Sequence, residues 1–270
     1  MTRHSKTQAL IAAAVKVLQE HNPMTVRQVY YQLVSRQVID NNRGSYQAVS
    51  KALVAARREA VIPWEWIEDR TRRPRTVGMW DNLADFAQTA ARAYRRNVWE
   101  SQPEVVECWV EKDALSGIFE DVLRPYGVTL NVGRGYDGWS SIKGAAERDP
   151  DTILYFGDFD PTGEDISRSL EERLGELGCR AEIVRCALTS DDVERYDLPP
   201  DFTKPADTRS AAFVARHGDR AVELDALPID VLRERIVSEV ESRMDLDALA
   251  EVRQAEETDR ERLREALAAL

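Results

Sequence analysis

Residues 105–187 alternate short apolar segments with amphipathic ones, and this pattern constrains the fold more than any other feature of the chain. We expect strands at 105–110, 128–132, 152–156 and 181–187, and helices at 114–123, 140–146 and 163–174. Alternation of this kind predicts a mostly parallel sheet covered by helices. In such a fold the functional residues lie at the carboxyl ends of the strands.

The first hundred residues are helical instead. Periodic apolar residues predict a helix at 6–20, a second at 26–38 with Thr25 as its cap, and a third with Ser45 as its cap. The segment 62–69 then alternates large apolar and acidic residues, as a short half-buried strand would. Three helices followed by a hairpin suggest a winged helix.

A domain boundary is expected where the composition changes from basic and helical to acidic and strand-containing. A fourth helix at about 80–99 leads to Ser101-Gln102-Pro103, where we place this boundary. We therefore expect residues 1–100 to form a winged-helix (CAP-like) DNA-binding domain. Residues 101–270 are expected to form an α/β domain with C-terminal helices.

The net charge of −11 conceals a division between the two parts of the chain. Residues 1–100 hold 16 Lys or Arg against 9 Asp or Glu, a net charge of +7, and residues 101–270 hold 21 against 39, a net charge of −18. A basic surface is what nucleic-acid binding requires, so the first part is the expected DNA-binding part. Its candidate phosphate contacts are Lys51, Arg57, Arg58, Arg70, Arg72 and Arg73. Ordinary solvated side chains would fit the three on the third helix equally well.

The remaining composition gives the expected compartment. No apolar run approaches the ~20 residues of a membrane span, and the N-terminus lacks the apolar core of a secretory signal. The three cysteines form no CxxC pair, so we expect free thiols rather than a disulfide framework or a zinc site. These features predict a cytoplasmic protein without a membrane segment, in contact with the nucleoid if it binds DNA.

Carboxylates follow two of the expected strands. Glu111 ends the first strand, and Asp158 and Asp160 follow the third. Three close carboxylates repel one another, and Mg²⁺ prefers such hard oxygen ligands, so this pattern predicts a divalent metal site. An Asp-x-Asp pair alone also occurs in glycosyltransferases, in hydrolases and in plain capping turns.

In combination, three motifs resemble the Toprim domain. They are Val-Glu-Lys-Asp-Ala-Leu at 110–115, a Gly-rich turn at 133–136, and Gly-Asp-Phe-Asp-Pro-Thr-Gly at 157–163. Their wording and order resemble the A subunit of topoisomerase VI and its relative, the meiotic double-strand-break transesterase. Because this chain is shorter than the usual A subunit and has no Gly-rich ATPase region, it looks most like the compact, stand-alone "Mini-A" type.

The resemblance implies roles for these motifs. Glu111, Asp158 and Asp160 would hold Mg²⁺, which Mn²⁺ can replace, and Glu111 would also help to move a proton to or from the scissile sugar oxygen. The turn residues expected beside a phosphate are Gly133, Arg134 and Gly135. A plain tight turn would look the same.

The same resemblance predicts a nucleophilic tyrosine in the N-terminal domain. Residues 25–31, Thr-Val-Arg-Gln-Val-Tyr-Tyr, are similar to the family signature whose last tyrosine attacks DNA, which is Tyr31 here. Arg27 lies four residues earlier on the same helical face, where its charge can steady a phenolate or the attacked phosphate. Gln28 departs from the acidic residue usual in the signature, and we expect Tyr30 to be a core residue.

The predicted function is therefore Mg²⁺-dependent cleavage of double-stranded DNA through a 5′-phosphotyrosyl intermediate. In the family a homodimer cuts both strands, and the tyrosine of one subunit faces the metal of the other. A separate ATPase partner is left open, and Glu223 and Asp225, in a further echo of the family at 222–227, are expected to be structural. The alternatives are a Toprim nuclease that uses metal-activated water and a non-catalytic DNA-binding component of a mobile element or defence system. An Asp-x-Asp glycosyltransferase is a more distant alternative.

Overall fold

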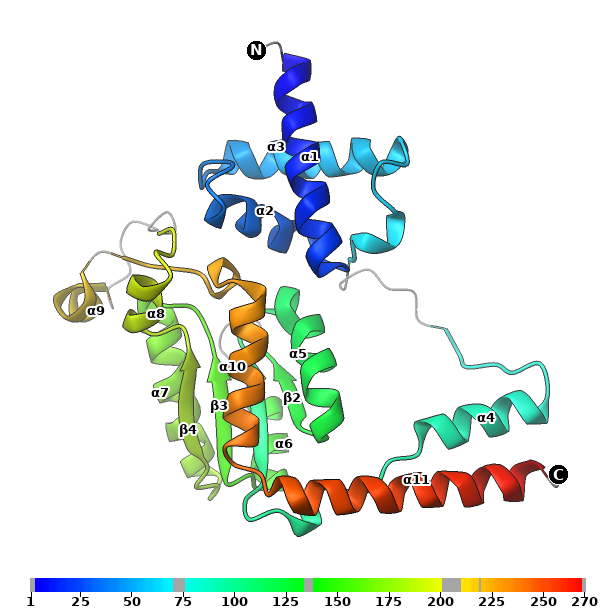
Figure 1. Cartoon of the computed structure of the whole chain (residues 1–270). Helices are drawn as coiled ribbons and strands as arrows, with labels where there is room; N and C mark the ends of the chain where they lie inside the picture. The colour runs from blue at the N-terminus through cyan, green and yellow to red at the C-terminus, as the bar shows by residue number, and fades with distance from the viewer. Residues whose placement is uncertain (1–2, 70–75, 134–137, 201–209, 219, 269–270) are drawn as a thin grey trace.

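The computed structural model describes residues 3–69, 76–133, 138–200, 210–218 and 220–268 (Figure 1). The predicted site residues that lie outside these ranges are Arg70, Arg72, Arg73, Arg134 and Gly135. All other predicted site residues are described.

A four-stranded, all-parallel sheet forms the centre of residues 106–187. Its strands are β1 (Val106–Val110), β2 (Thr129–Val132), β3 (Thr152–Phe156) and β4 (Glu182–Ala187), in the spatial order β2-β1-β3-β4. The predicted strands are confirmed to within a residue or two, and the chain has the α/β fold expected from the alternating pattern. β1 and β3 are buried at every position because helices cover both of their faces.

Two helices cover each face of the sheet. On one side, Trp109 and Tyr155 pack with α6 (Trp139–Arg148) and α7 (Pro161–Glu176). On the other side, the alternate strand residues Cys108 and Phe156 belong to the larger core, which α5 (Ser116–Leu123) and α10 (Ile229–Glu241) close. Successive strand residues point to opposite faces, so each strand joins both cores.

The N-terminal part consists of α1 (Arg3–His21), α2 (Val26–Ser35) and α3 (Arg43–Arg58) packed against one another. Thr25 caps α2 as predicted, because its hydroxyl accepts a hydrogen bond from Gln28 N while the Gln28 side chain accepts one from Thr25 N. The predicted cap of α3 was wrong by three residues. Asn42 is the cap, and its Oδ1 accepts a hydrogen bond from Ser45 N at 2.8 Å.

The predicted strand at 62–69 is wrong. A short 3-10 helix, η1 (Trp64–Trp66), occupies its centre, where Trp66 N donates to Pro63 O. Proline favours the turn conformation that begins this helix. Beyond it, Ile67 bridges Met24 in parallel, so this segment pairs with the entry to α2.

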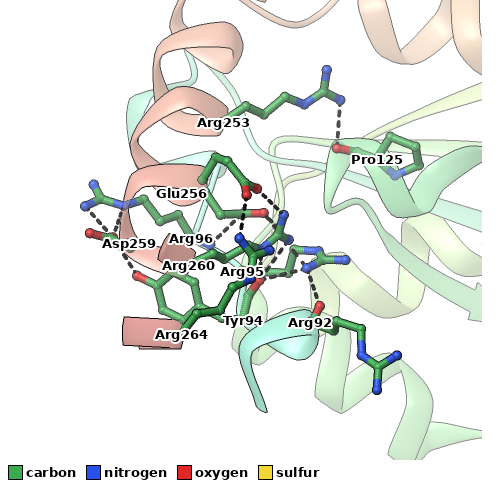
Figure 2. A network of polar contacts seen from close by, with 11 residues as sticks. Arg92, Tyr94, Arg95, Arg96, Pro125, Arg253, Glu256, Asp259, Arg260 and Arg264 are labelled. Atoms are coloured by element: carbon green, nitrogen blue, oxygen red, sulfur yellow. Dashed lines mark hydrogen bonds and ion pairs between the residues drawn. The ribbon is translucent and has the colours of Figure 1, made fainter. Parts of the chain in front are cut away.

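The C-terminal helix packs against a helix that precedes the sheet in sequence. α11 (Leu246–Ala268) packs along α4 (Leu83–Ala93), and the two helices extend away from the sheet (Figure 1). Polar contacts join the segment after α4 to α11 (Figure 2): Asp259 accepts from Tyr94 and Arg96, and Glu256 accepts from the Arg96 backbone N–H. Within α11, Glu256 also pairs with Arg260. α4 is shorter than the predicted helix.

The remaining described elements are η3 (Trp99–Ser101), η4 (Asp113–Leu115), η5 (Arg124–Tyr126), α8 (Ser190–Arg195), α9 (Ser210–His217) and η6 (Leu224–Ala226). Among the helices that the structure describes, none is long and apolar enough to cross a membrane. The three cysteines are free and buried, as expected.

Candidate active site

The candidate site lies at the carboxyl ends of the two central strands. The strand that follows β1 in sequence, β2, lies on one side of it, and the strand that follows β3, β4, lies on the opposite side of the sheet. The order in which strands are added therefore reverses between β1 and β3. Open parallel sheets bind ligands at such a point. Glu111 follows β1, and its Oε2 accepts hydrogen bonds from Asp158 N (3.0 Å) and from the Tyr155 hydroxyl (3.4 Å). Glu111 and Asp158 are therefore neighbours, as the sequence predicted.

Asp160 has a different local role. It is the N-cap of α7, and its Oδ1 accepts a hydrogen bond from Gly163 N at 2.6 Å. Gly163 is required here because a Cβ at this position would lie 2.2 Å from Asp158 O. Arg185 holds the same loop by donating to Asp158 O and Gly163 O. The motif at 157–163 thus folds into a tight turn that fixes both aspartates.

Lys112 lies at the centre of the site. Its Nζ is 2.9 Å from Asp158 Oδ1, 3.1 Å from Glu223 Oε2 and 3.3 Å from Asp225 Oδ2. Burial alone would lower the pKa of Lys112, but the charges of these carboxylates outweigh it and the pKa is raised. Lys112 therefore stays protonated and compensates part of the negative charge.

Tyr31 lies on α2 and contacts this group of charged side chains. Its hydroxyl donates a hydrogen bond to Glu223 Oε2 at 2.6 Å, and its side chain is only 6% exposed. The guanidinium of Arg27 lies over the Tyr31 ring, 5.5 Å from the centroid, and donates to Glu223 and to Asp225. The predicted one-turn spacing of Arg27 and Tyr31 is confirmed, and both side chains point toward the carboxylates.

Two carboxyl groups of the site have pKa values displaced in opposite directions. Burial would raise the pKa of Glu223, but Lys112 and Arg27, together with the hydrogen bond from Tyr31, lower it to about 2. At Asp158 burial dominates and, with the charge of Glu111, raises the pKa to about 7 although Lys112 opposes this. Glu223 is thus ionised at neutral pH, whereas Asp158 holds its proton to a higher pH than a free aspartate does.

The site opens to the surface through two hollows that share Arg27 and Tyr46. One, of about 210 Å³, is lined by Tyr31, Glu223 and Arg43 among others, and the second, of about 490 Å³, runs beside α3. Of the predicted phosphate contacts on α3, Arg57 lines the second hollow and its guanidinium lies 4.9 Å from the centroid of the Trp64 ring. Lys51 and Arg58 are exposed but do not line either hollow.

The carboxylates have suitable chemistry for Mg²⁺, but they do not form a closed ligand shell. Among the described residues, no three acidic, His or Cys side chains are grouped closely enough to hold a metal ion. One oxygen of each predicted ligand already has a partner within the chain: Oε2 of Glu111, Oδ1 of Asp158 and Oδ1 of Asp160. Hard carboxylate oxygens suit Mg²⁺, and the assignment of these three residues as its ligands stays a prediction.

Sequence reasoning missed three residues of this site. Lys112 was overlooked, and Glu223 and Asp225 were expected to be structural. Both carboxylates contact Arg27 and Lys112, and Glu223 also accepts the hydrogen bond from Tyr31. The signal was the acidic pair within the apolar segment 222–227, in which Asp225 is wholly buried with no hydrogen-bond partner for Oδ1 in the described chain. A buried acid of this kind requires a nearby positive charge.

The remaining prediction at this edge concerns the Gly-rich turn. Gly133 is buried, and its N–H donates to Val110 O at 2.7 Å, so it continues the pairing of β2 with β1. Its role beside a phosphate stays a prediction, since the rest of the turn lies outside the described ranges.

A scan against protein-family models and searches of curated proteins and of solved structures found no match to this chain.

Proposed function

We propose that this protein cleaves double-stranded DNA by tyrosine transesterification, in the manner of the topoisomerase VI A subunit. In this proposal residues 1–100 act as the winged-helix domain and residues 101–270 as the Toprim-like domain. The observation that carries it is the contact of the Tyr31 hydroxyl with Glu223, which shares Lys112 with Asp158. The phenol of Tyr31 is thereby connected, through Glu223 and Lys112, to Asp158 at the end of β3.

In the proposed reaction, the Tyr31 oxygen attacks a backbone phosphorus and the bond from phosphorus to the 3′ oxygen breaks. This leaves a 5′-phosphotyrosyl bond and a 3′-hydroxyl, so the phenol loses a proton and the leaving oxygen gains one. Arg27 is placed to attract the attacked phosphate, and Glu111 is the proposed carrier of the proton to the sugar oxygen. Mg²⁺ held by Glu111, Asp158 and Asp160 would stabilise negative charge on that oxygen.

We further propose that a homodimer makes the double-strand break, because one site cuts one strand. A separate ATPase subunit and association with the nucleoid stay predictions.

Denaturant trapping of duplex DNA labelled at its 3′ ends tests the proposal, because the 5′-phosphotyrosyl bond retains the fragment that carries the 3′ end. Wild-type protein with Mg²⁺ or Mn²⁺ is expected to retain labelled DNA on the protein after denaturation, and Tyr31→Phe is expected to retain none. Tyr30→Phe is the matched control, because Tyr30 is an equally buried neighbour whose hydroxyl donates to Asn41 instead. Adduct that persists in Tyr31→Phe would overturn the assignment. Free 5′-phosphate ends without adduct would indicate a nuclease that uses water.

A further inference from the structure

α4 carries two adjoining apolar stripes, but in the described chain one long helix, α11, packs along it. The inner stripe, where α11 packs, includes the buried residues Ala87 and Ala91. The outer stripe follows the spacing of three, four and three residues that is typical of a helix–helix seam, and consists of Leu83, Phe86, Ala90 and Ala93. A helix with so wide an apolar arc is typical of a bundle in which it has two neighbours.

The charged residues of α4 lie away from both stripes. At about 100° per residue, Asp85 and Arg92 fall on the side of the helix opposite the outer stripe. A second helix could therefore pack on the outer stripe without burying a charge from α4.

The outer stripe and the segment that leads into it expose large apolar side chains. Leu83 is 58% and Phe86 is 44% exposed, while Val77, Met79 and Trp80 are 82%, 86% and 45% exposed. These five residues leave roughly 600 Å² in water, at the upper end of what a monomer exposes in one patch. Two copies that pair through this surface would bury about 1,200 Å², which is the lower limit for a specific, stable interface.

Trp80 is held in place although it is exposed. Its ring packs edge to face against Phe86, with the centroids 4.9 Å apart, and its Nε1 donates a hydrogen bond to Thr89 Oγ1 at 3.0 Å. Because these contacts already restrict the side chain, binding would cost less conformational entropy than it does for a free tryptophan. Ordered aromatic side chains of this kind are typical anchors of protein interfaces.

The sizes of the side chains in the outer stripe indicate what covers it. The large residues, Leu83 and Phe86, lie in the N-terminal half of α4, and the small residues, Ala90 and Ala93, lie in the C-terminal half. A second α4 in the antiparallel direction sets large side chains against small ones along the whole seam, whereas a parallel copy sets large against large. A two-fold axis produces the antiparallel pairing, because each chain offers the other the same stripe.

This surface is separate from the candidate active site. α4 and α11 extend away from the sheet (Figure 1), and no residue of α4 lines either hollow of the site. A second chain can therefore reach the outer stripe without covering those hollows.

We propose that the outer stripe of α4 binds the outer stripe of a second copy of this chain in the antiparallel direction, so that α4 and α11 of two chains form a four-helix bundle. Leu83 then faces Ala93 of the second copy, and Phe86 faces Ala90. The proposed pairing rests on the homodimer of the proposed function, for which it names a contact surface, and does not depend on the chemistry of cleavage.

Sedimentation equilibrium of the full chain tests this surface. The wild type is expected to be a dimer, and Phe86→Glu and Ala90→Glu are expected to be monomers at the same concentration, because each puts a charge into the apolar seam. Arg92→Glu is the matched control on the opposite side of α4 and is expected to stay dimeric. Circular dichroism checks the fold. If Phe86→Glu loses helix content, Ala90→Glu decides, because it removes only a methyl group.

The outcomes separate this surface from the homodimer itself. A dimer that persists in folded Phe86→Glu and Ala90→Glu would overturn the proposed surface and leave the homodimer intact. A monomeric wild type would overturn both. Because DNA is absent from the experiment, a failure of the cleavage function would leave these results unchanged.

Disulfide cross-linking tests the antiparallel direction. Differently tagged Leu83→Cys and Ala93→Cys chains are mixed and oxidised, and we expect a linked dimer that carries both tags. Leu83→Cys alone is expected to form no link, because the two copies of residue 83 would lie about 15 Å apart along the helix axis. The wild type gives the background, since its three cysteines are buried. A link in Leu83→Cys alone, or none in the mixture, would overturn the proposed pairing.

Discussion

Tyr31 and Glu223 are 192 residues apart in sequence, yet the tyrosine hydroxyl donates a 2.6 Å hydrogen bond to the glutamate carboxylate. This contact connects the basic helical part of the chain to the acidic α/β part. It also places the proposed nucleophile beside Lys112 and, through it, Asp158.

Glu223 should make stability depend on acidity. Its pKa is lowered to about 2 in the folded state, so its contribution is present above the ordinary pKa of 4.5 and is lost as pH falls from there toward 2. Two to three pKa units correspond to about 3 kcal/mol at neutral pH. Urea unfolding at several pH values should show Glu223→Gln less stable than wild type at pH 7, with the difference shrinking in acid. A constant difference would contradict the assigned pKa.

Gly163→Ala should disturb the loop that carries both aspartates. The added Cβ would lie 2.2 Å from Asp158 O, and backbone atoms cannot yield as a flexible side chain does. We expect a lower Tm and loss of adduct formation. Gly175→Ala is the matched control, because it lies in the same helix with open space around its Cβ position. Equal effects of the two substitutions would show that the close approach is unimportant.

Mg²⁺ should stabilise the folded protein through Asp158 and Asp160. A ligand at a hundred times its Kd adds about 2.7 kcal/mol to the free energy of unfolding, so Tm should rise with Mg²⁺. Because the pKa of Asp158 is raised to about 7, protons compete with the metal, and the rise should be larger at pH 8 than at pH 6. The Asp158→Asn, Asp160→Asn double variant should show no rise. A rise of the same size in that variant would place the metal elsewhere.

DNA binding should depend on Arg57. It lines the hollow beside α3 that also contains Arg27, so Arg57→Ala should weaken binding and reduce the slope of log Kd against log salt by about 0.9 for one lost phosphate contact. Lys51→Ala and Arg58→Ala test whether these exposed residues also reach the duplex. Lys143→Ala is the control, because Lys143 is exposed on α6. This helix covers the sheet and does not belong to the N-terminal helices that include α3. Fluorescence anisotropy at several salt concentrations gives both quantities, and equal slopes in all variants would exclude these contacts.

The sequence was sufficient to predict the elements that have a long apolar pattern or that are buried on both faces. β3 was predicted at its observed bounds because five consecutive apolar or β-branched residues in an alternating chain leave little choice. The eight-residue segment at 62–69 was misassigned because its alternation is short, and Pro63 and the pairing with Met24 decide its conformation. Periodicity alone does not distinguish these cases.

The candidate site was predictable only in part, for a physical reason. Glu111 and Asp158 could be placed together because parallel strands end at one edge. The contacts of Glu223 with Lys112 and Tyr31 span more than a hundred residues and result from the packing of α2 on η6. No local pattern carries that information.

Mass spectrometry of Tyr31 after incubation with duplex DNA and Mn²⁺, followed by denaturation and nuclease digestion, tests most directly whether Tyr31 is the nucleophile. We expect a peptide containing Tyr31 with a nucleotide joined to its oxygen through a 5′-phosphate. An unmodified Tyr31 peptide together with cleaved DNA, or a nucleotide on another residue, would contradict it.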